Sequence, residues 1–92
     1  MSEYMEIESE MTDNPAVMHI HTNLPLAVGN VEIYHSLEEM EEGSAVAQAL
    51  SFIDGIERLK IDQHQLTVTR DPEVPWHIIV SEVTAVLKDF FL

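Results

Sequence analysis

Residues 44–70 read SAVAQALSFIDGIERLKIDQHQLTVTR, and they carry the strongest structural pattern in the chain. Ser44 suits a helix N-cap. The apolar residues after it recur at helical spacing on one stripe, at Val46, Leu50 and Ile53. Gly55 is typical of a helix end, because it adopts a left-handed conformation without a Cβ clash. Apolar and polar residues then alternate over 59–61 and 66–69, so the segment predicts a helix followed by a β-hairpin.

A second hairpin is predicted upstream of this segment. Apolar residues alternate with glutamates from Tyr4 to Ser9, and with histidines from Ala16 to Thr22. Between the two runs lies Thr12-Asp13-Asn14-Pro15, a turn sequence, because Asp and Asn side chains bond to nearby backbone and Pro fixes φ. We therefore expect two antiparallel strands, with His19 and His21 facing outward.

The stretch between the hairpins is predicted to be mostly irregular. Pro and Gly punctuate residues 23–30, and residues 31–35 form at most a short extended piece. Ser36 followed by Glu39 is a capping-box signature, so a helical turn should start here. Gly43 should interrupt that turn before the main helix begins.

The C-terminal residues predict one long amphipathic helix. Pro75 suits its first position, because the N–H that Pro lacks would be unpaired there anyway. Apolar residues then recur at spacings of three and four, at Trp76, Val80, Val83, Leu87 and Phe90. The predicted order is β-β-α-β-β-α. We expect a two-layer α+β fold, with a largely antiparallel sheet and both helices on one face, formed by residues 1–92 as a single domain.

The composition is strongly acidic. Seventeen Asp and Glu residues against four Lys and Arg give a formal net charge of −13. Such a charge repels nucleic-acid phosphates and anionic lipid headgroups, so we expect neither nucleic acid nor membrane as a partner. It favours a basic protein partner and, through repulsion between copies, a monomer.

The sequence contains no cysteine. Disulfides, thiolate catalysis, and zinc or iron–sulfur clusters held by cysteines of this chain alone are therefore excluded. The first ten residues lack the basic-then-apolar pattern of a signal peptide, and no apolar run approaches the ~20 residues that span a bilayer. We therefore expect a cytoplasmic protein.

Several motifs resemble those of one known family. In chain order they are Thr12-Asp13-Asn14-Pro15, Ser44-Ala45-Val46-Ala47-Gln48-Ala49-Leu50, Ile53-Asp54-Gly55-Ile56, Leu66-Thr67-Val68-Thr69-Arg70, and Trp76 at the start of the last helix. Together they resemble the N-terminal domain of Nfu/NifU-type iron–sulfur cluster scaffold proteins over nearly the whole chain. The departures from the family pattern are Asp13 and Ala45 in place of Pro, His19 in place of Lys, and Gln65 in place of an aromatic residue.

The resemblance implies a non-enzymatic domain that acts in iron–sulfur cluster assembly or delivery through protein–protein contacts. In the family a Cys-x-x-Cys motif of a separate C-terminal domain holds the cluster, and this sequence lacks that motif, so no cluster bound by this chain alone is implied. The implied partners are cluster-assembly or recipient proteins. The residues themselves agree: no nucleophile-elbow glycine pattern surrounds Ser44 or Ser51, and the three glycines form no phosphate-binding loop.

Two histidines form a candidate metal site. His19 and His21 are two apart on a predicted strand, so their side chains share one face about 7 Å apart. With a third ligand they could bind iron or zinc. The alternative function is therefore an iron- or other metal-binding carrier that uses surface histidines and carboxylates. Two exposed histidines on the wet face of a sheet are the simpler interpretation.

Two further features could contact a partner. Carboxylates cluster at the predicted helix start, at Glu38, Glu39, Glu41 and Glu42. They could dock a basic protein or hold hard cations weakly, or they could simply be a solvated helix start. Phe90, Phe91 and Leu92 crowd the C-terminus, and at least one should be exposed because the last helix buries only one face. We take Phe91 as the candidate docking residue.

Overall fold

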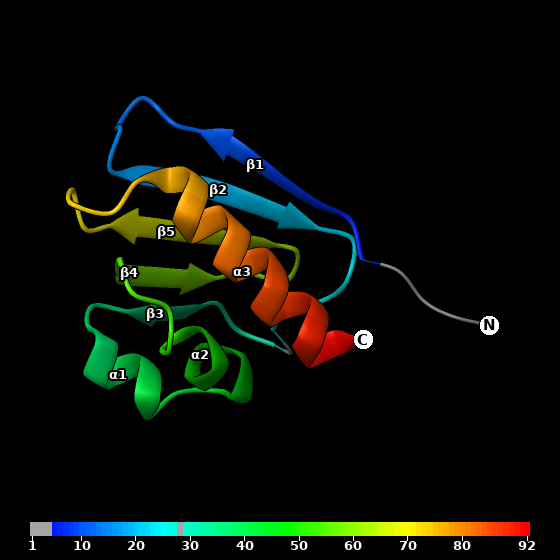
Figure 1. Cartoon of the computed structure of the whole chain (residues 1–92). Coiled ribbons are helices and arrows are strands. Elements are labelled where there is room, and N and C mark those ends of the chain that lie inside the picture. The colour runs from blue at the N-terminus through cyan, green and yellow to red at the C-terminus, as the bar shows by residue number, and fades with distance from the viewer. Residues whose placement is uncertain (1–4, 28) are drawn as a thin grey trace.

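The computed structural model describes residues 5–27 and 29–92, which form a two-layer α+β fold. A five-stranded antiparallel sheet has the order β1-β2-β5-β4-β3, and three helices cover one of its faces (Figure 1). The elements are β1 (Ile7–Met11), β2 (Val17–Thr22), β3 (Glu32–Tyr34), α1 (Leu37–Glu41), α2 (Ala45–Leu50), β4 (Ile56–Ile61), β5 (Gln65–Arg70) and α3 (Trp76–Phe91). The predicted fold class, antiparallel sheet and single helix layer are confirmed.

The two predicted hairpins meet in the middle of the sheet. β1 pairs with β2 and β4 pairs with β5, while the antiparallel β2–β5 pair joins the two hairpins. In that central pair Met18 lies opposite Val68, and Ile20 lies opposite Leu66. The apolar residues of both hairpins therefore line the face under the helices. The alternate residues, such as His19, point to the uncovered side of the sheet, which we call the open face.

The structure adds an edge strand and a third helix to the predicted order. The short extended piece pairs with β4 as the three-residue strand β3. Gly43 lies between α1 and α2, and each of these two helices has a serine N-cap. Ser36 Oγ accepts from Glu39 N in α1, and Ser44 Oγ accepts from Ala47 N in α2. The order is therefore β-β-β-α-α-β-β-α.

Three predicted boundaries shift. β1 begins at Ile7, whereas the strand was expected to begin at Tyr4, which lies outside the described residues. α2 ends at Leu50 and does not reach Ile53, because the chain turns there towards β4. Pro75 is the N-cap of α3 instead of its first helical residue, with extended backbone angles of φ −70° and ψ 150°.

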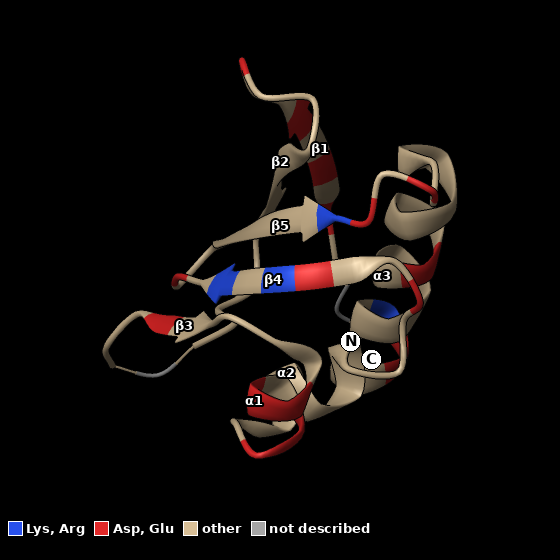
Figure 2. Cartoon of the chain, turned by 90° about the vertical axis from the view of Figure 1, so that its left-hand side faces the viewer, with Lys and Arg blue, Asp and Glu red and all other residues tan. Residues whose placement is uncertain are grey.

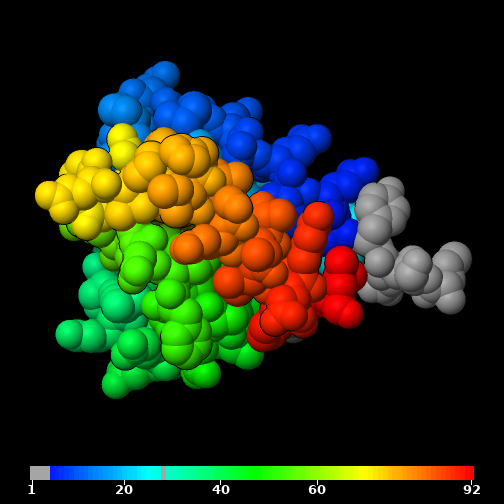
Figure 3. All heavy atoms as spheres, viewed as in Figure 1, coloured from blue at the N-terminus to red at the C-terminus, as the bar shows by residue number. Residues whose placement is uncertain are grey.

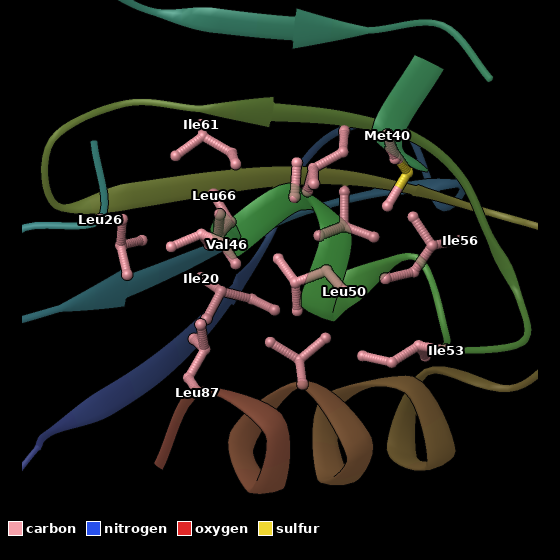
Figure 4. Close-up of a cluster of buried hydrophobic side chains, with 14 of the residues drawn as sticks. Ile20, Leu26, Met40, Val46, Leu50, Ile53, Ile56, Ile61, Leu66 and Leu87 are labelled. Atoms are coloured by element: carbon pink, nitrogen blue, oxygen red, sulfur yellow. The ribbon is translucent and has the colours of Figure 1, made fainter. Parts of the chain in front are cut away.

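The helices and the sheet enclose one hydrophobic core. Its largest fully buried side chains come from the central strands and all three helices: Ile20, Met40, Leu50, Leu59, Ile61, Leu66, Val68, Ile79, Val83 and Leu87. Figure 4 shows Leu50 and Leu87 pointing into the space between the helices and the sheet. Burying each such side chain contributes about 1.5–3 kcal/mol, so this cluster holds the two layers together.

The helix layer forms one continuous side of the molecule. With all atoms drawn, α3 lies between the β1–β2 hairpin and the pair α1 and α2 (Figure 3). Within the described residues, no helix combines the length and apolar character needed to cross a membrane.

Candidate functional site

The structure places His19 and His21 near each other on the open face of β2. Their ring centroids are 6.3 Å apart. His19 Nδ1 lies 3.0 Å from Gln65 Nε2 and 3.1 Å from Thr67 Oγ1, while His21 Nε2 lies 3.6 Å from Glu10 Oε1. A metal bound at His19 Nδ1 would therefore have to displace the Gln65 amide. In the described part of the chain, no three His, Asp or Glu side chains are grouped to hold a metal ion.

An open hollow of about 190 Å³ lies beside this pair. It is lined by Glu6, Glu8, His21, Thr22 and Asn23, and Asn23 Oδ1 accepts from Glu6 N at 2.7 Å. Small-molecule sites usually enclose roughly 300–1,000 Å³ behind mostly apolar walls. The hollow is smaller than that and has two carboxylates on its rim, so its shape does not resemble a typical small-molecule site.

The predicted acidic cluster lies on α1 and at its C-cap, and one of its members has a structural role. Glu39 bonds twice at the start of α1: its N–H donates to Ser36 Oγ at 3.2 Å, and its Oε1 accepts from His35 N, one residue before the N-cap, at 3.3 Å. All four carboxylates are exposed, and none of the other three has such a bond to the start of α1: they are Glu38, Glu41 and Glu42. In Figure 2 the acidic residues appear as red segments of the α1 ribbon. The cluster presents negative charge to solvent and is free to face a basic partner.

The C-terminal aromatic cluster is arranged differently from the expectation. Phe91 is partly buried and packs against the core, whereas Phe90 is 44% exposed and Leu92 59% exposed. The Phe90 and Phe91 rings meet edge-on with centroids 4.9 Å apart. The side chains that face solvent here are therefore Phe90 and Leu92, because Phe91 falls on the side of α3 that turns towards the sheet.

The most exposed large apolar side chain in the described residues is Phe52, which the sequence interpretation missed. It is 87% exposed, although its neighbours Ser51 and Ile53 are both buried. Phe52 lies in the turn just after α2, where helical spacing no longer gives the side that a residue faces. An exposed aromatic at the end of α2 is the kind of residue that anchors protein–protein interfaces.

The fold matches solved structures of known proteins. A NifU-like protein from Saccharomyces cerevisiae has a TM-score of 0.76 at 22% identity, with 97% of this chain and 82% of that protein covered. Protein SAV1430 from Staphylococcus aureus has a TM-score of 0.71 at 16% identity, with 89% of this chain and 98% of that protein covered. At these identities the likeness shows a shared fold.

Two curated relatives match in sequence. NifU-like protein 5, mitochondrial, from Arabidopsis thaliana is 30% identical over 88 residues, and NifU-like protein 4, mitochondrial, from the same plant is 28% identical over 88 residues. Each match covers 95% of this chain, which spans only 31% and 30% of the two relatives.

The names of these relatives contradict the expectation of a cytoplasmic protein. That expectation rested on the lack of a signal-peptide pattern. A missing secretory signal does not distinguish the cytosol from an organelle, because organelle-targeting segments have a different composition. The prediction was therefore wrong.

A family model agrees with the resemblance carried by the sequence motifs. The model described as the N-terminal region of scaffold protein Nfu/NifU matches residues 7–92. This range begins with β1 and ends just after α3, so it includes every strand and helix of the described structure. The chain therefore belongs to the Nfu/NifU N-terminal scaffold family.

Proposed function

We propose that this domain is a non-enzymatic interaction module of iron–sulfur cluster assembly or delivery, which binds a partner protein and holds no cluster itself. The family is associated with iron–sulfur cluster biology. The sequence supplies no cysteine thiolate, which is the usual ligand of such clusters. The partners are then cluster-assembly or recipient proteins.

The exposure of Phe52 is the observation that carries this proposal. Because Phe52 is 87% exposed, its ring contributes almost no hydrophobic free energy to the stability of the fold. Burial in a partner's pocket would recover this energy, and aromatic side chains are enriched among the residues that dominate binding.

The acidic cluster suggests the charge of that partner. α1 packs against α2, at whose end Phe52 lies, so the exposed carboxylates and the aromatic ring belong to the same helix layer. Interfaces combine an apolar centre with a polar rim. A partner that fits this layer would offer an apolar pocket bordered by Lys and Arg.

Phe52→Ala should weaken partner capture by about tenfold or more, because interface anchors commonly contribute 2 kcal/mol or more. The measurement is affinity purification of the wild-type and variant chains from cells that express the protein, with quantification of the recovered cluster-assembly and recipient proteins. Phe90→Ala is the matched control, since it removes the same ring from the far end of α3. Unfolding should be nearly unchanged by Phe52→Ala.

Two results would contradict this proposal. If no iron–sulfur protein were recovered with the wild-type chain, the proposed role in iron–sulfur cluster assembly or delivery would be contradicted. Equal recovery by wild type and Phe52→Ala, with a loss in Phe90→Ala, would move the contact to the C-terminal end of α3.

We expect ferrous iron not to bind saturably to the isolated chain. His19 and His21 lack a grouped third ligand among the described residues, and zinc and iron sites in proteins usually require at least three. Isothermal titration calorimetry under anaerobic conditions measures the binding of ferrous iron directly. Saturable binding that His19→Ala and His21→Ala both abolish would instead support the metal-carrier alternative.

A further inference from the structure

Charge on the open face of the sheet changes from one side to the other. The strand register places one row of residues across the sheet from β1 to β3, made of Glu10, His19, Thr67, Lys60 and Ile33. On the β1 side this row therefore has a carboxylate, Glu10. Its middle has the polar groups of His19 and Thr67, and its β3 side has a cation, Lys60, next to the aliphatic Ile33. The helices all lie on the opposite face (Figure 1).

The cations of this chain are few, and two of them gather on the open face. The sequence has four Lys and Arg residues. Arg70 donates to three backbone carbonyls and lies over the ring of Trp76, and Lys88 lies in the last turn of α3, where the helix dipole favours a positive charge. The other two are Arg58 and Lys60 on β4, seen as two blue bands in Figure 2.

Arg58 and Lys60 form no ion pair within 4.0 Å in the described residues, although Glu57 and Asp62 flank them in the sequence. Among the described residues, the one ion pair within 4.0 Å joins His21 and Glu10, on the other side of the open face. The neighbours of the two cations on β5 are threonines, and Glu57 precedes them at a β-bulge. Alternate residues of a strand lie about 7 Å apart, so two exposed positive charges lie close together, and neither is held in an ion pair within 4.0 Å in the described residues.

We propose that the β3–β4 side of the open face binds an acidic, extended segment of a partner protein. Alternate carboxylates of an extended segment are also about 7 Å apart, which matches Arg58 and Lys60. An apolar residue of the segment would cover Ile33, which is 57% exposed. Glu8 and Glu10 repel the same segment from the β1 side, so the charge gradient fixes where it binds.

A short acidic segment fits this surface better than a long polyanion. The formal charge of −13 repels nucleic acid along its whole length. The two carboxylates of a short segment instead lie within the Debye length, about 8 Å in physiological salt, of the two cations. This surface is separate from Phe52, so the proposal does not rest on the proposed function.

The test is an NMR titration of the ¹⁵N-labelled whole chain with the peptide Gly-Glu-Val-Glu-Gly and with its neutral counterpart Gly-Gln-Val-Gln-Gly. The acidic peptide should shift the amide signals of β3 and β4 at millimolar concentration. The neutral one should bind about fivefold more weakly, because it lacks two exposed ion pairs, each of which contributes at most about that factor. The double variant Arg58→Gln/Lys60→Gln should lose at least as much. Both side chains are exposed, so the variant should keep the spectrum of a folded chain.

A matched control separates local contact from net charge. Lys88→Gln removes one positive charge from the helix side and should change the affinity less than twofold, whereas Lys60→Gln removes one from the open face and should change it more. Equal effects of these two variants would overturn the proposal. So would equal affinity for both peptides, shifts confined to the helix layer, or no shift at all. None of these results affects the Phe52 capture experiment.

Discussion

Replacing Leu50 with alanine should lower the free energy of unfolding by about 2–5 kcal/mol, the usual cost of such a truncation in a well-packed core. Leu50 is fully buried and extends from α2 into the centre of the cluster in Figure 4. The truncation would leave a cavity between α2 and the rest of the core. A 92-residue domain has a total stability of only ~5–14 kcal/mol, so this loss is a large fraction of it.

Urea unfolding followed by far-UV circular dichroism measures this effect. The midpoint should fall while the slope with denaturant stays the same, because the surface exposed on unfolding barely changes. Leu92→Ala is the control: the same substitution at a 59% exposed position should shift the free energy by less than about 0.5 kcal/mol. Similar midpoints for the two variants would mean that α2 does not pack into the core through Leu50.

Elements defined by local chemistry were predictable from the sequence. Ser36 and Glu39 predicted a capping box, and Ser36 Oγ accepts from Glu39 N as expected, while Glu39 Oε1 accepts from His35 N, one residue before the N-cap. Gly55 predicted a left-handed backbone conformation at the helix end, and its φ is +102°. A Cβ there would lie 2.8 Å from Val74 Cβ, which gives a second reason for glycine. Such features depend on a few neighbouring residues, so a single sequence contains the information.

Features that depend on strand order were not predictable. Alternation puts Arg58 and Lys60 on one face, but only the strand pairing shows that their cross-strand neighbours are Thr69, Thr67 and Ile33. The role of β3 as an edge strand likewise depends on pairing with β4, which comes later in the chain. The alternation of apolar and polar residues in a strand indicates which face of the sheet each residue is on. It does not indicate which residues of other strands lie next to it.

The candidate site was predicted less completely than the fold. The sequence located the acidic cluster, but it did not distinguish Glu39, whose side chain accepts from His35 N at the start of α1, from the other three carboxylates. Phe52 was overlooked because it lies in the turn after α2, where neither helical nor strand spacing gives the side that a residue faces. Exposure of an apolar residue becomes informative only once the packing around it is known.

Trp76→Ala should destabilise the domain by about 2–4 kcal/mol, somewhat less than the 3–5 kcal/mol typical of a fully buried aromatic, because the ring is only partly buried. Trp76 Nε1 donates to Pro15 O at 2.8 Å, and Arg70 Nε donates to the same carbonyl at 3.3 Å. The Arg70 guanidinium also lies 5.7 Å from the centre of the Trp76 ring. These contacts tie the turn between β1 and β2 to the end of β5 and the start of α3.

Trp76→Phe separates packing from hydrogen bonding in this junction. It keeps a ring under Arg70 but loses the donor to Pro15, so it should cost less than Trp76→Ala, about 0.5–1.5 kcal/mol from the hydrogen bond plus a smaller packing loss. Trp76 is the single tryptophan, so unfolding must be followed by circular dichroism and not by its fluorescence. A Trp76→Ala variant as stable as the wild type would show that the core alone, without this junction, holds the first hairpin against α3.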